Sequence, residues 1–186
     1  CTLTAGEIVA IDGKTVRGSR STANGSLHIV SAWATANQLV LGQLATEEKS
    51  NEIKAIPKLL DMLDLAQCIV TIDAMGCQKT IAKKIIEKGA DYVFSLKGNQ
   101  GTMHGEVKMQ FEGATDAALN AKTSDFFETV DGDHGRIETR KFWVTDRIDW
   151  LSQKDDWVGL RSVGIIESTR EVGEKTSTER RYFLLS

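Results

Sequence analysis

The sequence lacks several features, and each absence argues against a class of protein. Its three cysteines, Cys1, Cys68 and Cys77, show neither a CxxC pair nor zinc-ligand spacing, and their odd number fits a reducing compartment such as the cytoplasm. No apolar run approaches the length of a membrane span, and no secretory signal is present. A net charge of −3 argues against a domain that only binds nucleic acid, because such domains are usually basic. The 186 residues, 41% hydrophobic and 26% charged, are ordinary for one well-buried domain with an insertion.

The single proline, Pro57, falls inside a stretch with helical spacing. Ser50 or Asn51 can cap this helix at its start. Because proline lacks a backbone N–H, either the helix begins near Ala55 with Pro57 in its first turn, or it is kinked at Pro57. The apolar residues that predict its buried stripe are Ile53, Ile56, Leu59, Leu60 and Leu63.

Two short apolar runs that each end in an aspartate are the main feature of the sequence. Residues 8–11 precede Asp12, and residues 69–72 precede Asp73. Such runs are typical of buried strands, in which nothing requires a carboxylate. If the two strands are parallel neighbours in register, their backbones lie about 4.8 Å apart and both carboxylates point to the same face. Carboxylates this close repel each other unless one is protonated or a cation lies between them, so the pattern predicts a divalent-metal site.

A strand-terminal aspartate can also serve only to cap the helix or turn that follows it. For one such aspartate alone, the capping interpretation is the better one. Two strands of matched layout, Ile8-Val9-Ala10-Ile11-Asp12 and Ile69-Val70-Thr71-Ile72-Asp73, favour the metal site instead.

The elements that follow the first aspartate strand predict a mixed sheet. Two alternating segments make an antiparallel meander with that strand. The second aspartate strand, a helix and a further strand then predict parallel neighbours joined by crossovers. A three-strand meander followed by two parallel strands is the ribonuclease H-like order, so we expect an α/β fold with a five-stranded mixed sheet and helices. The predicted segments are strands over 27–34, 38–46 and 91–97 and a helix over 78–88 that ends at Gly89.

The last part of the chain reads as a β-rich region. We expect a core over residues 1–112, which ends in a helix over 103–112, and a β-rich insertion region over 113–186. Residues 114–124 are small and polar, typical of a loop or frayed helix. The chain begins without methionine and ends directly after an apolar strand, so we expect a piece of a larger protein. The predicted strands of the β-rich region are 126–130, 137–144, 157–166 and 180–185.

Four short motifs occur in order: Ala10-Ile11-Asp12-Gly13-Lys14, Thr71-Ile72-Asp73-Ala74, the sequence SLKGNQ at 95–100 and the sequence HGRIETR at 134–140. Together they resemble the ISAs1-type insertion-sequence transposases, which include the H-repeat-associated proteins of enteric bacteria. The resemblance covers nearly the whole chain. It implies a bacterial, cytoplasmic DDE transposase domain whose carboxylates bind two Mg²⁺ or Mn²⁺ ions and which cleaves and transfers DNA strands at insertion-sequence ends.

By this resemblance, Asp12 and Asp73 are the first two catalytic carboxylates and the metal ligands. The family carries its third carboxylate, a glutamate, on a helix after the β-rich insertion. This chain ends before any such helix, and Glu138 in the HGRIETR motif is the motif glutamate that remains. Because strand periodicity places Glu138 within the insertion, we expect the third ligand to lie outside this chain, with Glu138 as the alternative.

The resemblance also implies DNA as a partner, at the element ends and at the target, and a homodimer acting on paired ends. Basic residues that follow the first aspartate could contact phosphates, although a basic loop without this role is equally consistent with the sequence. The candidate DNA-binding residues are Lys14, Arg17, Lys97, Asn99, His134 and Arg136.

Two other functions stay open. A transposase remnant without its third carboxylate would be catalytically inactive and would act as a DNA-binding or structural domain. An α/β phosphohydrolase with Asp12 as nucleophile would need a second aspartate two residues later, where Lys14 stands. Mg²⁺ bound at Asp12 and Asp73 would favour the transposase over the inactive remnant, and Lys14 argues against the phosphohydrolase.

Overall fold

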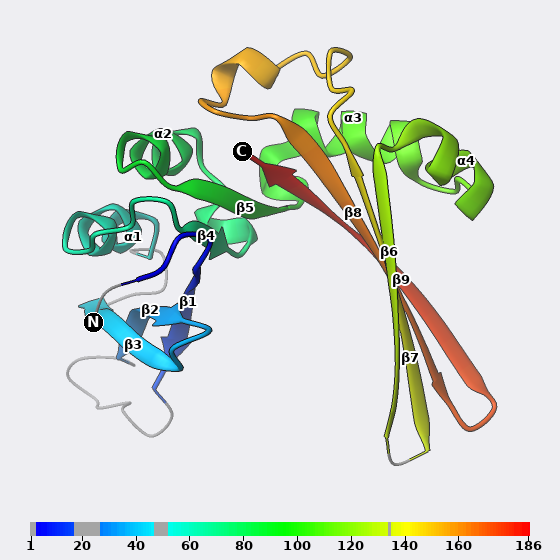
Figure 1. The fold of residues 1–186 in the computed structure, drawn as a ribbon, viewed down its shortest axis with the longest axis horizontal. Helices are drawn as coiled ribbons and strands as arrows, with labels where there is room; N and C mark the ends of the chain where they lie inside the picture. The colour runs from blue at the N-terminus through cyan, green and yellow to red at the C-terminus, as the bar shows by residue number, and fades with distance from the viewer. Residues whose placement is uncertain (1–2, 17–26, 47–51, 134) are drawn as a thin grey trace. The chain divides into compact units, whose positions relative to one another are not determined.

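The computed structural model describes residues 3–16, 27–46, 52–133 and 135–186, so the predicted DNA-binding residues Arg17 and His134 lie outside the described residues. The chain forms two compact units, each described here by itself (Figure 1). The first unit comprises Cys1–Phe94, Asp156–Gly159 and Ser186. The second comprises Ser95–Asp155 and Leu160–Leu185.

The first unit is built on a mixed sheet in the order β3-β2-β1-β4-β5. The meander β1-β2-β3 is antiparallel, and β1 pairs with β4, and β4 with β5, in parallel. The predicted meander and the predicted parallel neighbours are therefore confirmed. The strands are β1 (Ile8–Thr15), β2 (His28–Ala34), β3 (Leu39–Thr46), β4 (Ile69–Ile72) and β5 (Asp91–Leu96).

Helix α1 (Glu52–Asp61) agrees with one of the two predicted alternatives and departs from the prediction in its buried stripe. It begins at Glu52 and contains Pro57, so of the two alternatives the start near Ala55 is wrong. Ile53 is 37% exposed, whereas Glu52 is only 6% exposed. The reason is helical geometry, because the buried stripe follows spacings of three, four, seven and eight residues from Glu52 rather than from Ile53. The buried apolar residues of this stripe are Ala55, Ile56, Leu59 and Leu60.

Helix α2 (Lys79–Glu87) follows the prediction closely. Ile81, Ala82 and Ile85 are buried. Gly89 has a φ of +69°, the left-handed conformation in which glycine commonly ends a helix. A single 3₁₀ turn, η2 (Ala74–Gly76), leads from the second aspartate toward this helix.

The second unit contains an antiparallel sheet in the order β9-β8-β7-β6. The segment predicted as a loop or frayed helix forms α4, whose first turn is capped by the Thr115 hydroxyl accepting from Ala118 N at 3.3 Å. The strand predicted to begin at Trp157 begins only at Ser162, because Gly159 takes a φ of +79° that interrupts extended backbone. The elements are η3 (Gly98–Gln100), α3 (Gly101–Phe111), α4 (Asp116–Lys122), β6 (Asp125–Asp133), β7 (Arg136–Thr145), η4 (Lys154–Asp156, whose last residue belongs to the first unit), β8 (Ser162–Val172) and β9 (Lys175–Leu185).

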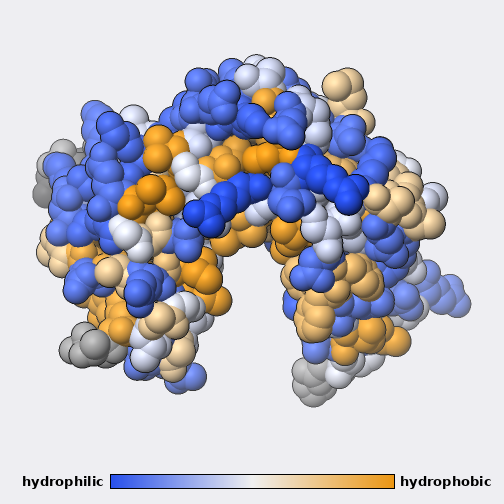
Figure 2. Space-filling model, turned by 45° about the horizontal axis from the view of Figure 1, so that its top comes forward, coloured by the Kyte–Doolittle hydropathy of each residue, from blue (hydrophilic) through white to orange (hydrophobic). Residues whose placement is uncertain are grey.

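Each unit has its own apolar core. In the first unit Val9, Val70 and Leu59 are fully buried, and Trp143 and Ile165 are fully buried in the second. Apolar residues also appear on the surface among hydrophilic ones (Figure 2). No helix within the described ranges is long and apolar enough to cross a membrane.

Candidate metal site

The two aspartates stand at equivalent positions on neighbouring parallel strands. Strand β1 pairs with β4 in the register that sets Ile11 opposite Ile72. Asp12 and Asp73 are the residues that directly follow this pair in β1 and after β4. The predicted in-register pairing of the two strands is therefore observed. Adjacent strands lie about 4.8 Å apart, which brings the two carboxylate-bearing positions side by side at the carboxyl end of β4.

Both aspartates are set apart from the buried side chains of their strands. Val9 and Ile11 on β1 are buried, and so is Ile72 on β4. Because successive residues of a strand point to opposite faces, Asp12 projects on the face opposite Ile11. Asp73 lies just past the end of β4 and caps the turn that follows. Both aspartates are exposed to solvent. Water, an ion or a substrate can therefore reach this edge of the unit.

Asp73 also caps the turn that follows it. Its Oδ1 accepts hydrogen bonds from Met75 N at 3.1 Å and from Gly76 N at 3.4 Å. These bonds satisfy the first donors of η2 and hold the carboxylate in a defined orientation. Oδ1 accepts both hydrogen bonds, so the second oxygen, Oδ2, is not needed for the cap.

Asp12 has a cationic neighbour on its own strand. Lys14 Nζ lies 3.5 Å from Asp12 Oδ2, and both side chains are well exposed. Two residues apart on a strand, the two side chains share a face. An exposed pair of this kind contributes only about 0–1 kcal/mol, so a cation of higher charge can displace the lysine at little cost.

The strand next to β1 adds polar groups that the sequence did not single out. Ser31 on β2 stands directly opposite Asp12. Gln43 on β3 donates from Nε2 to Ser31 Oγ at 3.0 Å. Register alone brings these residues together, and no spacing in the sequence marks them.

Glu138, the alternative third carboxylate, is engaged within the second unit. Its Oε2 lies 2.9 Å from Arg136 Nη2, and its Oε1 lies 2.7 Å from Arg140 Nη2. Its side chain is only 16% exposed. Both carboxylate oxygens are thus paired with arginines, and a metal ion would have to displace them.

The other candidate residues that the structure describes, Lys97, Asn99 and Arg136, lie in the second unit. Lys97 and Asn99 are exposed where β5 ends and η3 begins. Lys97 is close enough to Glu179 to help lower the pKa of that carboxyl, after the larger effects of Arg181. Arg136 is committed to Glu138. Their part in DNA binding stays a prediction.

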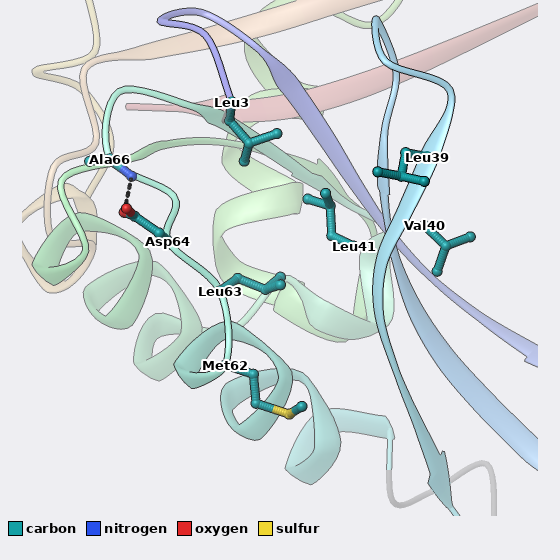
Figure 3. A pocket seen from close by; sticks show the side chains of 8 residues that line it. All are labelled: Leu3, Leu39, Val40, Leu41, Met62, Leu63, Asp64 and Ala66. Carbon is teal, nitrogen blue, oxygen red and sulfur yellow. Dashed lines mark hydrogen bonds between the residues drawn. The ribbon is translucent and has the colours of Figure 1, made fainter. Parts of the chain in front are cut away.

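The aspartates do not form a complete ion cage by themselves. In the described part of the chain, no group of three or more His, Cys, Asp or Glu side chains could hold a metal ion. A separate cavity of about 430 Å³ lies elsewhere in the first unit, between β3 and the segment after α1 (Figure 3). Aliphatic side chains dominate its lining, and Asp64, which accepts from Ala66 N at 3.5 Å, is the single acidic group among the described residues that line it. These described residues therefore include no pair of carboxylates.

Comparison with known proteins gives a consistent family. The model of the transposase DDE domain matches residues 4–158. A protein of the dhlA 3′ region in Xanthobacter autotrophicus, itself uncharacterised, is 46% identical over 96% of this chain and 59% of its own. Two Escherichia coli proteins are named provisionally as transposases. YncI of strain O157:H7 is 45% identical over 99% of this chain and 48% of its own, and the H repeat-associated YhhI of strain K12 is 41% identical over 97% and 49%.

The chain spans about half the length of these relatives. Among solved structures, the piggyBac transposase synaptic complex with hairpin DNA aligns with 98% of this chain and 33% of its own, at 9% identity and a TM-score of 0.44. At this TM-score the likeness supports no conclusion about fold or function. The match to the family model and the relatives show that the chain belongs to the transposase DDE domain family, together with the H repeat-associated proteins.

Proposed function

We propose that this chain carries the first two carboxylates, Asp12 and Asp73, of a metal-dependent site that cleaves and transfers DNA strands at insertion-sequence ends. The observation that carries the proposal is the parallel register of β1 and β4, which pairs Ile11 with Ile72, the two residues directly before the aspartates. Two carboxylates side by side repel each other unless one is protonated or a cation lies between them.

The residues present fit a divalent ion. Carboxylate oxygens are the hard ligands that Mg²⁺ and Mn²⁺ prefer, and both aspartates are exposed. Two such ions, when bound, supply charge stabilisation for the attacking and leaving oxygens of phosphodiester transfer. In this proposal Asp12 and Asp73 would hold the ions. Asp73 would bind through the oxygen left outside its cap, so the cap would orient this ligand.

Lys14 has a second part in the proposal. It neutralises Asp12 when no metal is bound, and it turns to a phosphate oxygen of DNA when an ion takes its place. Lys97, Asn99 and Arg136, with Arg17 and His134, are proposed to contact the DNA backbone elsewhere. A second copy of the chain would act on the paired DNA end.

The strand order supports a ribonuclease H-like core, which we propose to span residues 1–112, with 113–186 as a β-rich insertion region. The third carboxylate is proposed to come from outside the chain. The pairing of both Glu138 oxygens with Arg136 and Arg140 supports this assignment over Glu138 itself. The chain would then bind metal partially and would depend on further protein for strand cleavage.

Calorimetric titration with Mn²⁺ tests the proposal. The unmutated chain should bind Mn²⁺, and Asp12→Ala and Asp73→Ala should each weaken binding by at least about tenfold, because each removes a metal ligand. Asp91→Ala is the matched control, since Asp91 stands at the opposite, amino end of the same sheet, opposite Ile69. It should bind Mn²⁺ unchanged. Absence of binding by the unmutated chain would favour the inactive remnant instead.

A further inference from the structure

A buried carboxylate lies behind the strand that carries Asp12. Glu52 begins α1 and is only 6% exposed. A Cβ atom placed on Gly13 would lie 2.5 Å from Glu52 Cδ, 2.6 Å from Oε2 and 2.7 Å from Oε1. All three distances are far shorter than a van der Waals contact. Any residue larger than glycine at position 13 must therefore displace the Glu52 carboxyl group.

The contact comes from the face opposite the metal site. Gly13 follows Asp12 directly, and alternation along β1 puts its missing side chain on the face of Val9 and Ile11, which are both buried. Glu52 thus meets the backbone of β1 from the core side, while Asp12 projects to the solvent side. The carboxyl group of Glu52 and the side chain of Asp12 flank the same short piece of strand.

Glu52 also stands in the first turn of α1, where an acidic side chain gains about 0.3–1 kcal/mol from the helix dipole, and up to about 2 kcal/mol when it is partly buried. That gain does not depend on β1. The close approach of the Glu52 carboxyl group to Gly13, the residue next to Asp12, is a separate feature and indicates a role in the shape of β1.

We propose that Glu52 is a positioning residue for Asp12: its carboxyl group fills the space beside Gly13 and fixes the backbone from which Asp12 projects. The inference rests on the proposed metal function of Asp12. It assigns the effect to the size and place of the carboxyl group, so glutamine, which has the same shape, should replace it.

Two measurements on the whole chain test the inference. Mn²⁺ affinity should fall by about 10- to 100-fold in Glu52→Ala, as is typical when a group that orients a metal ligand is removed, and should stay within about twofold in Glu52→Gln. Amide hydrogen exchange at Gly13 and Lys14 should accelerate in Glu52→Ala and not in Glu52→Gln.

Two controls separate positioning from general stability. Glu7→Gln alters another buried carboxylate of the first unit, which accepts from Ala36 N at 2.8 Å. Gly42→Ala on β3 would place a Cβ 3.1 Å from Leu59 Cδ1. Leu59 lies on α1, the helix that also carries Glu52. Both should leave Mn²⁺ affinity unchanged.

The possible outcomes are distinct. Unchanged Mn²⁺ affinity in a folded Glu52→Ala variant would overturn the inference, and so would equal loss in Glu52→Gln. If the unmutated chain binds no Mn²⁺, the proposed function fails, and hydrogen exchange alone decides the positioning role: exchange at Gly13 that does not change in Glu52→Ala would reject it.

Discussion

At the scale of single residues, Asp73 caps a turn, and in the proposal it also binds metal, two roles that its sequence position offers as alternatives. Its Oδ1 caps η2 through Met75 N and Gly76 N, which is the structural role expected of a strand-terminal aspartate. The cap does not exclude metal binding, because it uses one carboxylate oxygen and fixes the direction of the other. The two roles can be separated by substitution.

Asp73→Asn should separate the cap from the ligand. Asparagine caps about as well as aspartate but lacks the charge, so the free energy of unfolding should change little while Mn²⁺ affinity falls by at least about tenfold. Asp73→Ala should lose both, with a cost of about 1 kcal/mol for the cap. Urea unfolding and Mn²⁺ titration on both variants provide the measurement. Equal Mn²⁺ affinity of Asp73→Asn and the unmutated chain would contradict the ligand role.

Cys77 gives the first unit a predictable weakness at alkaline pH. Its thiol is fully buried, and burial raises its pKa from 9.0 to about 12. In the unfolded chain the thiol ionises near its ordinary pKa, while in the folded chain it stays protonated. Its contribution to stability is therefore complete below pH 9 and is lost as the pH rises from about 9 toward 12.

The measurement is the free energy of unfolding in urea at pH 8 and pH 10. The unmutated chain should lose about 1 kcal/mol more than Cys77→Ala over this interval, because one pKa unit corresponds to about 1.4 kcal/mol. Burial, and to a smaller extent the neighbouring Cys77, also raises the pKa of Tyr92. Tyr92 is present in both chains, so the part of its effect that comes from burial is common to both. Identical losses in the two chains would show that Cys77 ionises freely when folded.

At the scale of elements, one arginine ties the end of α3 to the sheet of the second unit. Arg180 on β9 pairs through Nε with Glu167 Oε2 at 2.6 Å. Its Nη1 donates to Phe111 O at 2.8 Å and its Nη2 to Ala114 O at 2.6 Å. The guanidinium thereby satisfies carbonyls at and just beyond the end of the helix. The rigid planar group makes all three bonds at once, which lysine cannot do.

Arg180→Ala should lower the free energy of unfolding by about 3–5 kcal/mol, because it leaves Glu167, whose side chain is 15% exposed, without its partner and removes two carbonyl bonds. Arg181→Ala is the matched control. Arg181 is the next residue, and its pair with Glu179 at 2.7 Å is exposed, so its loss should cost at most about 1 kcal/mol. Urea unfolding of the two variants compares them. Equal effects would refute the special role of Arg180.

At the scale of the whole molecule, metal binding and folding should be linked. An ion that binds only the folded chain stabilises it, by about 2.7 kcal/mol when its concentration is one hundred times its Kd. Mn²⁺ should therefore raise the melting temperature of the unmutated chain, and EDTA should reverse the rise. The chain carrying both Asp12→Asn and Asp73→Asn should show no rise. A rise of equal size in that variant would mean that Mn²⁺ binds elsewhere.

The family of the protein is a property of the chain as a whole. The match over residues 4–158 and the relatives establish a transposase DDE domain, and the chain spans about half of those relatives. In the proposal, cleavage and strand transfer of DNA require a longer protein than this chain. Within the described chain, the first unit contributes the paired aspartates and the second unit contributes a sheet rich in arginine–carboxylate pairs.

The sequence by itself determined the two aspartate strands, the meander, the parallel pairing and the course of α2. These follow from local rules, because unbroken apolar runs, turn residues and helical spacing act over a few neighbouring residues. It was less reliable where local signals conflict. Pro57 suggested a later start for α1, and the apolar residues near Trp157 suggested a longer strand, which Gly159 prevents.

Only the tertiary structure decided what meets across the chain. The burial of Glu52 instead of Ile53, the approach of its carboxyl group to Gly13, the pairing of Ser31 with Asp12 and the reach of Arg180 to the end of α3 join residues that are far apart in sequence. Such contacts depend on strand register and helix packing, which one residue's own neighbours do not encode. The aspartates could be found from their strands, but the groups that lie beside them could be found only in the fold.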